Sequence, residues 1–204
     1  TASDPTVLGL GFTAVRDFVS FLMHDEVDGA GRPNPSRGSG PGLEAAYGWG
    51  RSQSGRFLRE FVYRGFNEDG LGRRVFAGIS PHVSGAGRVV LNYRFAQPGR
   101  YPRQHSDHSY PSDQFPFAYR VITDPLTGKT DGILKRPASD PVVVHTQTSA
   151  EYWERRGSLV HTDPGGNDLG EQDGVRTFLF AGSQHNADPL AGAQTGPHRN
   201  LSNP

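Results

Sequence analysis

A serine-containing turn between an apolar run and a helical pattern is the feature that most constrains the fold. Residues 47–56 read Tyr-Gly-Trp-Gly-Arg-Ser-Gln-Ser-Gly-Arg. Gly50, Ser52 and Ser54 fit the pattern small–x–nucleophile–x–small, with serine at the last position, where glycine is commoner. Small residues two before and two after the central serine let a strand end and a helix start pass close together. The stretch therefore predicts a strand–turn–helix unit with an exposed serine hydroxyl at its apex.

Ser52 is the nucleophile that this turn predicts. The backbone N–H of the next residue, Gln53, faces such a site and can stabilise an oxyanion. Ser54 is the alternative nucleophile. We prefer Ser52 because the residue two after Ser54 is Arg56, which is too bulky for the close-packed position.

Strand and helix patterns alternate along the chain, which predicts an α/β fold with a mostly parallel sheet flanked by helices. Apolar spacing predicts helices over residues 5–23, 54–63 and 150–156. Apolar runs predict strands over residues 44–49, 74–79, 141–146 and 175–181. The run 141–146 is β-branched and continuous, as in a strand buried in a parallel sheet.

The remaining segment, residues 84–139, has no clear period. Aromatic residues are interleaved there with Pro, Gly, His and Asp, and the whole chain holds Gly 27 and Pro 16. Compact domains seldom carry so long an irregular insertion without a use for it. We therefore expect one domain over residues 1–204 with a cap or lid at 84–139. Packing of this insertion against the body of the domain is the alternative.

Charge and composition exclude several classes of function. The formal net charge of +0 gives no basic surplus for nucleic acid or an anionic membrane. The count of Cys 0 rules out disulfides, thiolate metal sites and a cysteine nucleophile. No apolar stretch approaches the roughly 18 residues that a membrane span needs. The first residue is Thr1 and no signal peptide follows it, so we expect a processed protein or a fragment.

Three candidate side chains follow predicted strands, where functional groups of open parallel sheets collect. They are Ser52, Glu151 and His185, in the chain order of an α/β-hydrolase triad. A serine hydroxyl is a poor nucleophile at neutral pH, so His185 would take its proton and later pass it to the leaving group. The carboxylate of Glu151 would fix the tautomer of the imidazole and stabilise the imidazolium.

Other residues compete for two of these roles. His82 also follows a predicted strand and is a second candidate base, whereas His145 lies within a strand and is expected to be a core residue or to support the site from behind. Asp163 is the alternative acid, because residues 158–162 would extend a strand and place it at a carboxyl end. Asp140 precedes its strand and lies at the wrong end of the sheet.

A histidine-rich stretch, His105-Ser106-Asp107-His108, raises the question of a metal site. Neighbouring residues of an irregular loop rarely all point at one ion, so we expect no metal ligand and no cofactor. Three arginines near the serine turn would either recognise an acidic substrate or pair with local carboxylates: Arg51, Arg56 and Arg59.

Four segments together resemble a known family. They are Gly-Leu-Gly-Phe-Thr-Ala-Val-Arg-Asp (9–17), Gly-Trp-Gly-Arg-Ser-Gln-Ser-Gly-Arg-Phe-Leu-Arg (48–59), Phe-Pro-Phe-Ala-Tyr (115–119) and Phe-Ala-Gly-Ser-Gln-His (180–185). They resemble the bacterial α/β-hydrolase-domain proteins, a large family of expected esterases. The resemblance implies the α/β-hydrolase fold, with Ser52 as nucleophile and His185 as base, and it supports Glu151 less strongly because the surroundings of the acid vary.

The resemblance also implies that part of the fold is missing. In that fold several strands precede the serine turn, and a loop after the third strand supplies a second oxyanion donor, whereas here one helix precedes the turn. The chain therefore looks like the C-terminal half of a longer protein, with the N-terminal half as its partner. Loss of one oxyanion donor costs roughly 100- to 1,000-fold in turnover, so we expect the chain alone to be weakly active.

The sequence thus predicts a serine hydrolase that cleaves a small carboxylic ester through an acyl-enzyme. An acyltransferase or an amidase would use the same residues. The alternative from another class is a non-catalytic α/β domain that binds a ligand or partner. A third reading is a metal-dependent hydrolase that uses the loop His105–His108.

Overall fold

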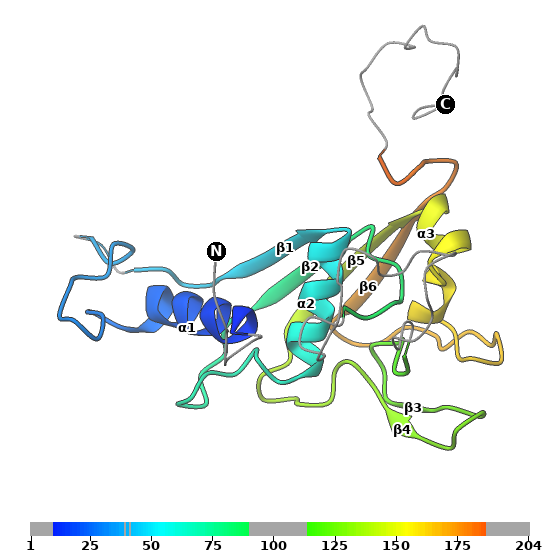
Figure 1. Cartoon of the computed structure of the whole chain (residues 1–204), viewed down its shortest axis with the longest axis horizontal. Helices are drawn as coiled ribbons and strands as arrows, with labels where there is room; N and C mark the ends of the chain where they lie inside the picture. The colour runs from blue at the N-terminus through cyan, green and yellow to red at the C-terminus, as the bar shows by residue number, and fades with distance from the viewer. Residues whose placement is uncertain (1–9, 39, 41, 90–113, 187–204) are drawn as a thin grey trace, which may run out of the picture.

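The computed structural model describes residues 10–38, 40, 42–89 and 114–186 (Figure 1). The helices are α1 (Gly11–His24), α2 (Gln53–Tyr63), α3 (Ser149–Glu154) and the 3₁₀ helix η2 (Gly157–Val160). The strands are β1 (Tyr47–Arg51), β2 (Gly78–His82), β3 (Ile122–Thr123), β4 (Thr130–Asp131), β5 (Val142–Thr148) and β6 (Val175–Phe180). Where residues are described, α1, α2 and α3 lie within two residues of the predicted bounds, whereas η2 takes the place of the strand extension considered for residues 158–162. Residues 5–9 of the first predicted helix lie outside the described part.

The main sheet has four strands in the order β1-β2-β5-β6, and all neighbours are parallel. This confirms the predicted fold class. The register aligns Arg51 with His82, His82 with Thr146, and Thr146 with Phe178 in one row across the sheet. Figure 1 places α3 beside the end of the sheet toward which the strands run. The end of β1, the start of α3 and the loop after β6 therefore share one edge of the sheet.

Helix α2 covers one face of this sheet, and its apolar stripe explains why. Leu58, Phe61 and Val62 recur at helical spacing and are buried in one cluster with Ile79 of β2 and Val143 of β5. The apolar spacing that predicts this helix is thus the face that it buries. Helix α1 joins the same core through the ring of Phe12, which is 1% exposed.

The opposite face of the sheet is exposed, which corrects the prediction that the strand at residues 141–146 is buried. β1 alternates between exposed and buried residues, and so does the first half of β5. Six large apolar side chains on this face are exposed: Tyr47, Trp49, Val142, Val144, Phe178 and Phe180. We call this set the open sheet face. An unbroken apolar run indicates burial on both faces, but the run itself cannot supply the second covering layer.

The predicted strand at residues 74–79 is wrong in its position. Val75 and Phe76 are buried, but they lie in an irregular segment, and the strand begins only at Gly78. The side chain of Asn67 replaces the strand partner, because its Nδ2 donates to the Phe76 carbonyl at 2.9 Å and its Oδ1 accepts from the Phe76 N–H at 2.9 Å. His82 consequently lies within the strand, as its last residue.

The described part of the 84–139 insertion packs around α2. The hairpin β3–β4 contacts the C-terminal end of this helix, where the Tyr63 hydroxyl donates to the Asp131 carboxylate at 2.8 Å. Ser52 lies at the N-terminal end of α2, so the hairpin contacts the end of this helix opposite to Ser52. Figure 1 likewise draws the hairpin apart from α3. Residues 90–113 lie outside the described part, so the lid stays a prediction.

Candidate active site

Ser52 occupies the turn between β1 and α2 in a strained backbone conformation. Its φ is 56° and its ψ is −115°, a region that L-residues other than glycine rarely adopt. Such strain costs on the order of 1–3 kcal/mol and is found mostly at functional sites. The Ser52 N–H donates to the His82 carbonyl at 2.8 Å, which ties the turn to the end of β2. The following residue, Gln53, begins α2, so its N–H has no acceptor within the helix.

Two glycines allow the strand and the helix to approach. A Cβ on Gly50 would lie 2.4 Å from the carbonyl oxygen of Ser54, and one on Gly55 would lie 2.9 Å from the carbonyl oxygen of Gly50. The small residue needed two before Ser52 is thus confirmed. On the helix side the close contact falls on Gly55, three residues after Ser52, rather than on Ser54. Ser54 is exposed, which explains why a serine is tolerated there.

Glu151 is the acid that the structure places against His185. Its side chain is fully buried, its Oε1 accepts a hydrogen bond from Nδ1 of His185, and its Oε2 accepts from the Thr148 N–H at 3.0 Å and from the Thr148 hydroxyl. Burial alone would raise the pKa of Glu151, but the hydrogen bonds from Thr148 and His185 outweigh it and hold the pKa below its ordinary value. The carboxylate is therefore ionised at neutral pH.

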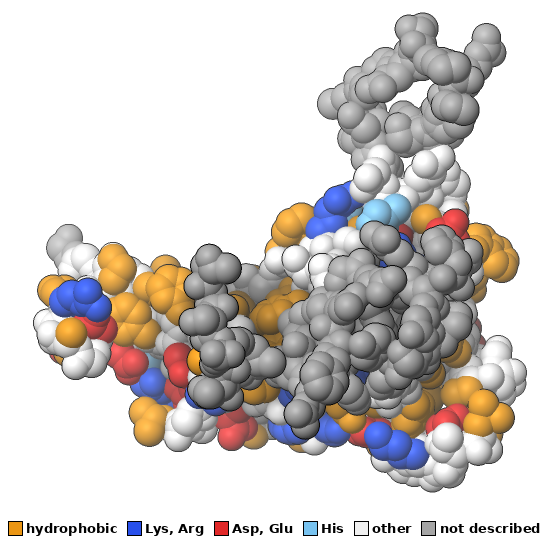
Figure 2. All heavy atoms as spheres, viewed as in Figure 1, with side chains coloured by type: hydrophobic (Ala, Val, Ile, Leu, Met, Phe, Trp, Pro, Cys, Tyr) orange, Lys and Arg blue, Asp and Glu red, His pale blue; other side chains and the backbone are white. Residues whose placement is uncertain are grey.

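His185 lies five residues beyond the end of β6, in a loop that turns at Gly182. The imidazole is 28% exposed, so one side of the ring faces solvent while Nδ1 faces Glu151. With Nδ1 bonded to a carboxylate, the other ring nitrogen, Nε2, is left as the basic atom. Figure 2 shows histidine and basic side chains together on the surface at this end of the molecule.

Arg51 connects the serine turn to the histidine loop. Its Nη2 donates to the main-chain carbonyl of His185 at 2.9 Å and to the side-chain oxygen of Asn186. The guanidinium of Arg59 likewise donates to main-chain carbonyls, those of Ala86 and Phe117. Pairing with local carboxylates was one of two expectations for these arginines, and the contacts observed for Arg51 and Arg59 are with carbonyl and amide oxygens instead.

Ser52 and His185 face the same edge of the sheet without a direct hydrogen bond. Within the described residues, no hydrogen bond joins the Ser52 hydroxyl to the His185 ring. Catalytic hydrogen bonds are often loose in the absence of substrate. The structure thus joins Glu151 to His185 by a hydrogen bond and places Ser52 on a strained turn at the same edge of the sheet.

His82, the second candidate base, differs from His185 in its partner. Its Nδ1 contacts the hydroxyl of Thr146 at 2.7 Å rather than a carboxylate. Burial lowers the pKa of His82, and the positive charge of Arg51 lowers it further. The ring stacks on Trp49 with 6.2 Å between the centroids. His82 is therefore neutral at neutral pH, and the hydrogen-bond partner of its Nδ1 is a hydroxyl rather than a carboxylate.

Three further candidates lie away from His185. His145 is fully buried, its Nδ1 contacts the Tyr119 hydroxyl at 2.8 Å, and burial lowers its pKa well below the ordinary value, as expected of a core histidine. Asp163 accepts hydrogen bonds from the backbone and side chain of Asn167 within its own turn. Asp140 caps the backbone of Arg136 at 2.6 Å.

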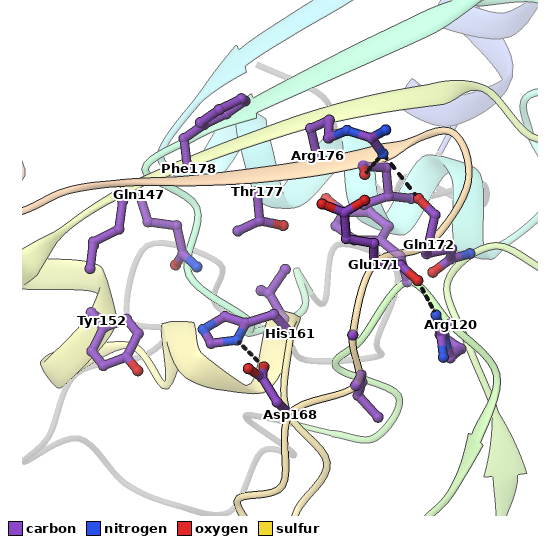
Figure 3. Close-up of a pocket in the computed structure, with 16 residues that line it drawn as sticks. Arg120, Gln147, Tyr152, His161, Asp168, Glu171, Gln172, Arg176, Thr177 and Phe178 are labelled. Atoms are coloured by element: carbon purple, nitrogen blue, oxygen red, sulfur yellow. Dashed lines mark hydrogen bonds and ion pairs between the residues drawn. The ribbon is translucent and has the colours of Figure 1, made fainter.

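A cavity of about 470 Å³ lies beside β6, between this strand, η2 and the loop that precedes the strand (Figure 3). Gln147, Tyr152, His161 and Thr177 contribute polar atoms to its wall, and Figure 3 shows the amide of Gln147 directed toward His161. The lining includes none of the three predicted triad residues.

Metal binding and membrane insertion receive no support from the described residues. Within residues 10–89 and 114–186, apart from the undescribed 39 and 41, no three His, Asp or Glu side chains are grouped so as to hold a metal ion. The stretch His105–His108 lies outside these ranges. The described helices are also too short or too polar to span a bilayer.

Two residues that contact the site, Thr148 and Arg51, were not predicted to do so from the sequence. Thr148 could have been found, because Thr148-Ser-Ala-Glu151 is the Thr-x-x-Glu signature of a capping box, here present with the Glu151 side chain bonded to the Thr148 N–H. The link from Arg51 to His185 leaves no such signal, since it joins residues 134 positions apart.

Comparison with known protein families agrees with this geometry. The model of a family described as "Alpha/beta hydrolase domain" matches residues 9–202, nearly the whole chain. A search of curated proteins gave no match, and a search of solved structures gave none either. With a serine turn, a buried acid and a histidine at the carboxyl edge of a parallel sheet, and with this match along its length, the chain belongs to the alpha/beta hydrolase domain family.

Proposed function

We propose that this protein is a serine hydrolase that cleaves small carboxylic esters, with Ser52 as nucleophile, His185 as general base and Glu151 as the orienting acid. The observation that carries the proposal is the hydrogen bond between Nδ1 of His185 and the buried carboxylate of Glu151, at the sheet edge where the strained turn at Ser52 also lies. A buried, ionised carboxylate paired with a partly exposed imidazole is the arrangement that a general base needs.

The reaction begins with attack of the Ser52 hydroxyl oxygen on the ester carbonyl carbon. The hydroxyl proton passes to Nε2 of His185, and the Nδ1–H of the resulting imidazolium donates to Glu151. The oxyanion of the tetrahedral intermediate accepts a hydrogen bond from the Gln53 N–H, at the positive end of α2. The bond from carbon to the leaving oxygen then breaks, and His185 returns its proton to the alcohol.

Water completes the cycle. His185 takes a proton from a water molecule, whose oxygen attacks the acyl carbon, and the proton returns to the Ser52 oxygen as the acid leaves. The aromatic residues of the 84–139 insertion would shape the acyl or alcohol pocket. An acyltransferase would use the same steps with another alcohol in place of water. Transfer to an added alcohol, measured against hydrolysis, separates the two.

The first experiment is covalent labelling with a fluorophosphonate, which modifies activated serines. Wild type is expected to be modified at Ser52, and Ser52→Ala to lose both the label and ester hydrolysis. Ser54→Ala is the matched control, because it removes a hydroxyl two residues away that is exposed on the first turn of α2. A wild-type chain that takes no label would favour the binding-domain alternative. Labelling of Ser54 would instead assign the nucleophile to Ser54.

A second pair of variants tests the base. His185→Ala is expected to slow labelling about 1,000-fold or more, as in other triads that lose a member. His82→Ala removes a ring at the same edge whose partner is a threonine, and we expect it to change the rate far less. Equal losses in the two variants would contradict the assignment of His185.

The N-terminal half of a longer protein stays part of the proposal. The open sheet face supports it, because parallel sheets in α/β proteins are covered on both faces. Such a partner would also supply the second oxyanion donor. We therefore expect a measurable labelling rate from this chain and a slow turnover.

A further inference from the structure

The loop that carries His185 is fastened to the acid side of the site by Ser149, the first residue of α3. The Gly182 N–H donates to the Ser149 hydroxyl at 2.9 Å, and the Ser149 N–H donates to the Ser183 carbonyl at 3.1 Å. Together with the Glu151–His185 pair, these bonds place the loop over the end of β5. They do not by themselves place it relative to β1.

The strand order puts the histidine loop far from β1. β1 and β6 are the two edges of the sheet, with β2 and β5 between them. Neighbouring strands lie about 4.8 Å apart, so the ends of β1 and β6 are separated by roughly 14 Å. The loop after β6 must therefore cross two strand ends before the His185 ring can approach Ser52.

Arg51 reaches across this gap from the serine turn. It is the last residue of β1, directly before Ser52, and its side chain is on the exposed face of the strand. The two N–H groups of one guanidinium nitrogen, Nη2, reach the His185 carbonyl and the Asn186 side chain. Arg51 thus binds the main chain of His185, the proposed base, and directly precedes Ser52, the proposed nucleophile, in the sequence.

We infer that Arg51 is a positioning residue that sets the separation between Ser52 and the His185 ring. This inference rests on the proposed hydrolase function, and it adds a residue that acts on the substrate only through His185. The long planar guanidinium suits the task, because it offers two donors from a single nitrogen. A lysine in its place would keep a charge and donors but would fix their directions less firmly.

The test compares Arg51→Met, Arg51→Lys and the control Arg176→Met in the full 204-residue chain. Arg176 is also an exposed strand arginine whose guanidinium donates to backbone carbonyls, those of Gln172 and Val175, away from His185. The rate of fluorophosphonate labelling at Ser52 is measured against reagent concentration. Arg51→Met is expected to lower the maximal labelling rate about 10- to 100-fold, with the half-saturating concentration unchanged, as for a misplacement of about 1 Å. Arg51→Lys should recover part of the rate, and Arg176→Met should match wild type.

Backbone ¹⁵N order parameters of His185 and Asn186 supply a readout that does not depend on activity. Both are expected to fall in Arg51→Met and to stay at wild-type values in Arg176→Met. Unchanged order parameters, or a looser loop with an unchanged labelling rate, would overturn the positioning role. Failure of the proposed function is distinguishable, because then the wild-type chain itself takes no label. Thermal melts of each variant identify any loss that comes from unfolding, and Arg51→Lys decides the matter if Arg51→Met does not fold.

Discussion

At the scale of single residues, Glu151 serves two neighbours with one carboxylate. Oε1 meets the His185 ring, while Oε2 meets the backbone and hydroxyl of Thr148. The Thr148 contacts hold the carboxylate in place and favour its charged form, so the cap of α3 also orients the proposed base. If His185 is the base, Thr148 would therefore influence the proposed proton transfer without contacting His185.

Thr148→Val is expected to lower the free energy of unfolding by about 1 kcal/mol at pH 7, since it removes a cap and a donor to a buried carboxylate. The pKa of Glu151 is lowered in the folded protein, so its stabilisation is complete above the unfolded pKa of about 4.3 and is lost as the pH falls through the folded pKa. The difference between variant and wild type should therefore shrink toward pH 3. Urea unfolding at both pH values measures it.

Thr123→Val is a suitable control for that measurement, because Thr123 is exposed on β3 and its hydroxyl contacts that of Thr130 at 2.8 Å. A Thr148→Val difference that stayed constant between pH 7 and pH 3 would mean that Thr148 does not act through the Glu151 carboxylate.

At the scale of elements, the serine turn depends on how closely β1 approaches α2. Gly50→Ala would force a Cβ to within 2.4 Å of the Ser54 carbonyl, and that backbone cannot move without shifting Ser52. We expect a loss of about 1–3 kcal/mol in the free energy of unfolding and a slower labelling rate at Ser52. Gly70→Ala is the control, since a Cβ there would meet nothing within 4 Å. Equal stability of the two variants would show that the turn relaxes freely.

The same elements show how far the sequence could be interpreted. The strand–turn–helix unit and the run after Pro141 were predictable, because turn chemistry and apolar spacing are local. The strand at 74–79 was misplaced, since Val75 and Phe76 are as apolar as strand residues while their backbone is bonded by the Asn67 side chain. A side chain that imitates a strand partner leaves no periodic signal.

For the site, chain order and strand ends were enough to make Glu151 and His185 candidates, and the structure places them in contact. The choice against Asp163 was beyond the sequence, because it depends on that side chain bonding to Asn167 in its own turn. The contribution of Arg51 was beyond it as well, since the path of a loop across two strand ends is decided by packing rather than by spacing.

At the scale of the whole molecule, the open sheet face is the least expected feature. Trp49 is 66% exposed and Phe178 is 52% exposed, although both lie in strands of the main sheet. Exposed apolar patches of this kind mark interaction surfaces. One face of the main sheet is therefore covered by α2, and the open sheet face is available for contact with another polypeptide layer.

The double substitution of Trp49→Gln and Phe178→Gln tests whether that face is open in solution. Each change is expected to alter the free energy of unfolding by about 0.5 kcal/mol or less, as at other surface positions, and together they should reduce binding of the dye ANS. Ile79→Ala, on the covered face and 3% exposed, should cost about 2–5 kcal/mol. A large loss in the double variant would instead indicate that another layer already covers the face.

The hydrogen bond from Arg51 to the His185 carbonyl joins positions 134 residues apart, and this separation has a consequence for the order of folding. Contacts between distant parts of a chain are formed late, because the entropy of closing the intervening loop must first be offset by other contacts. The serine turn is local and can form early, whereas we expect the histidine loop to reach it only after the strands of the main sheet, β1-β2-β5-β6, have paired. During refolding, reactivity of Ser52 should therefore appear after the secondary structure, as a late signal that the sheet is complete.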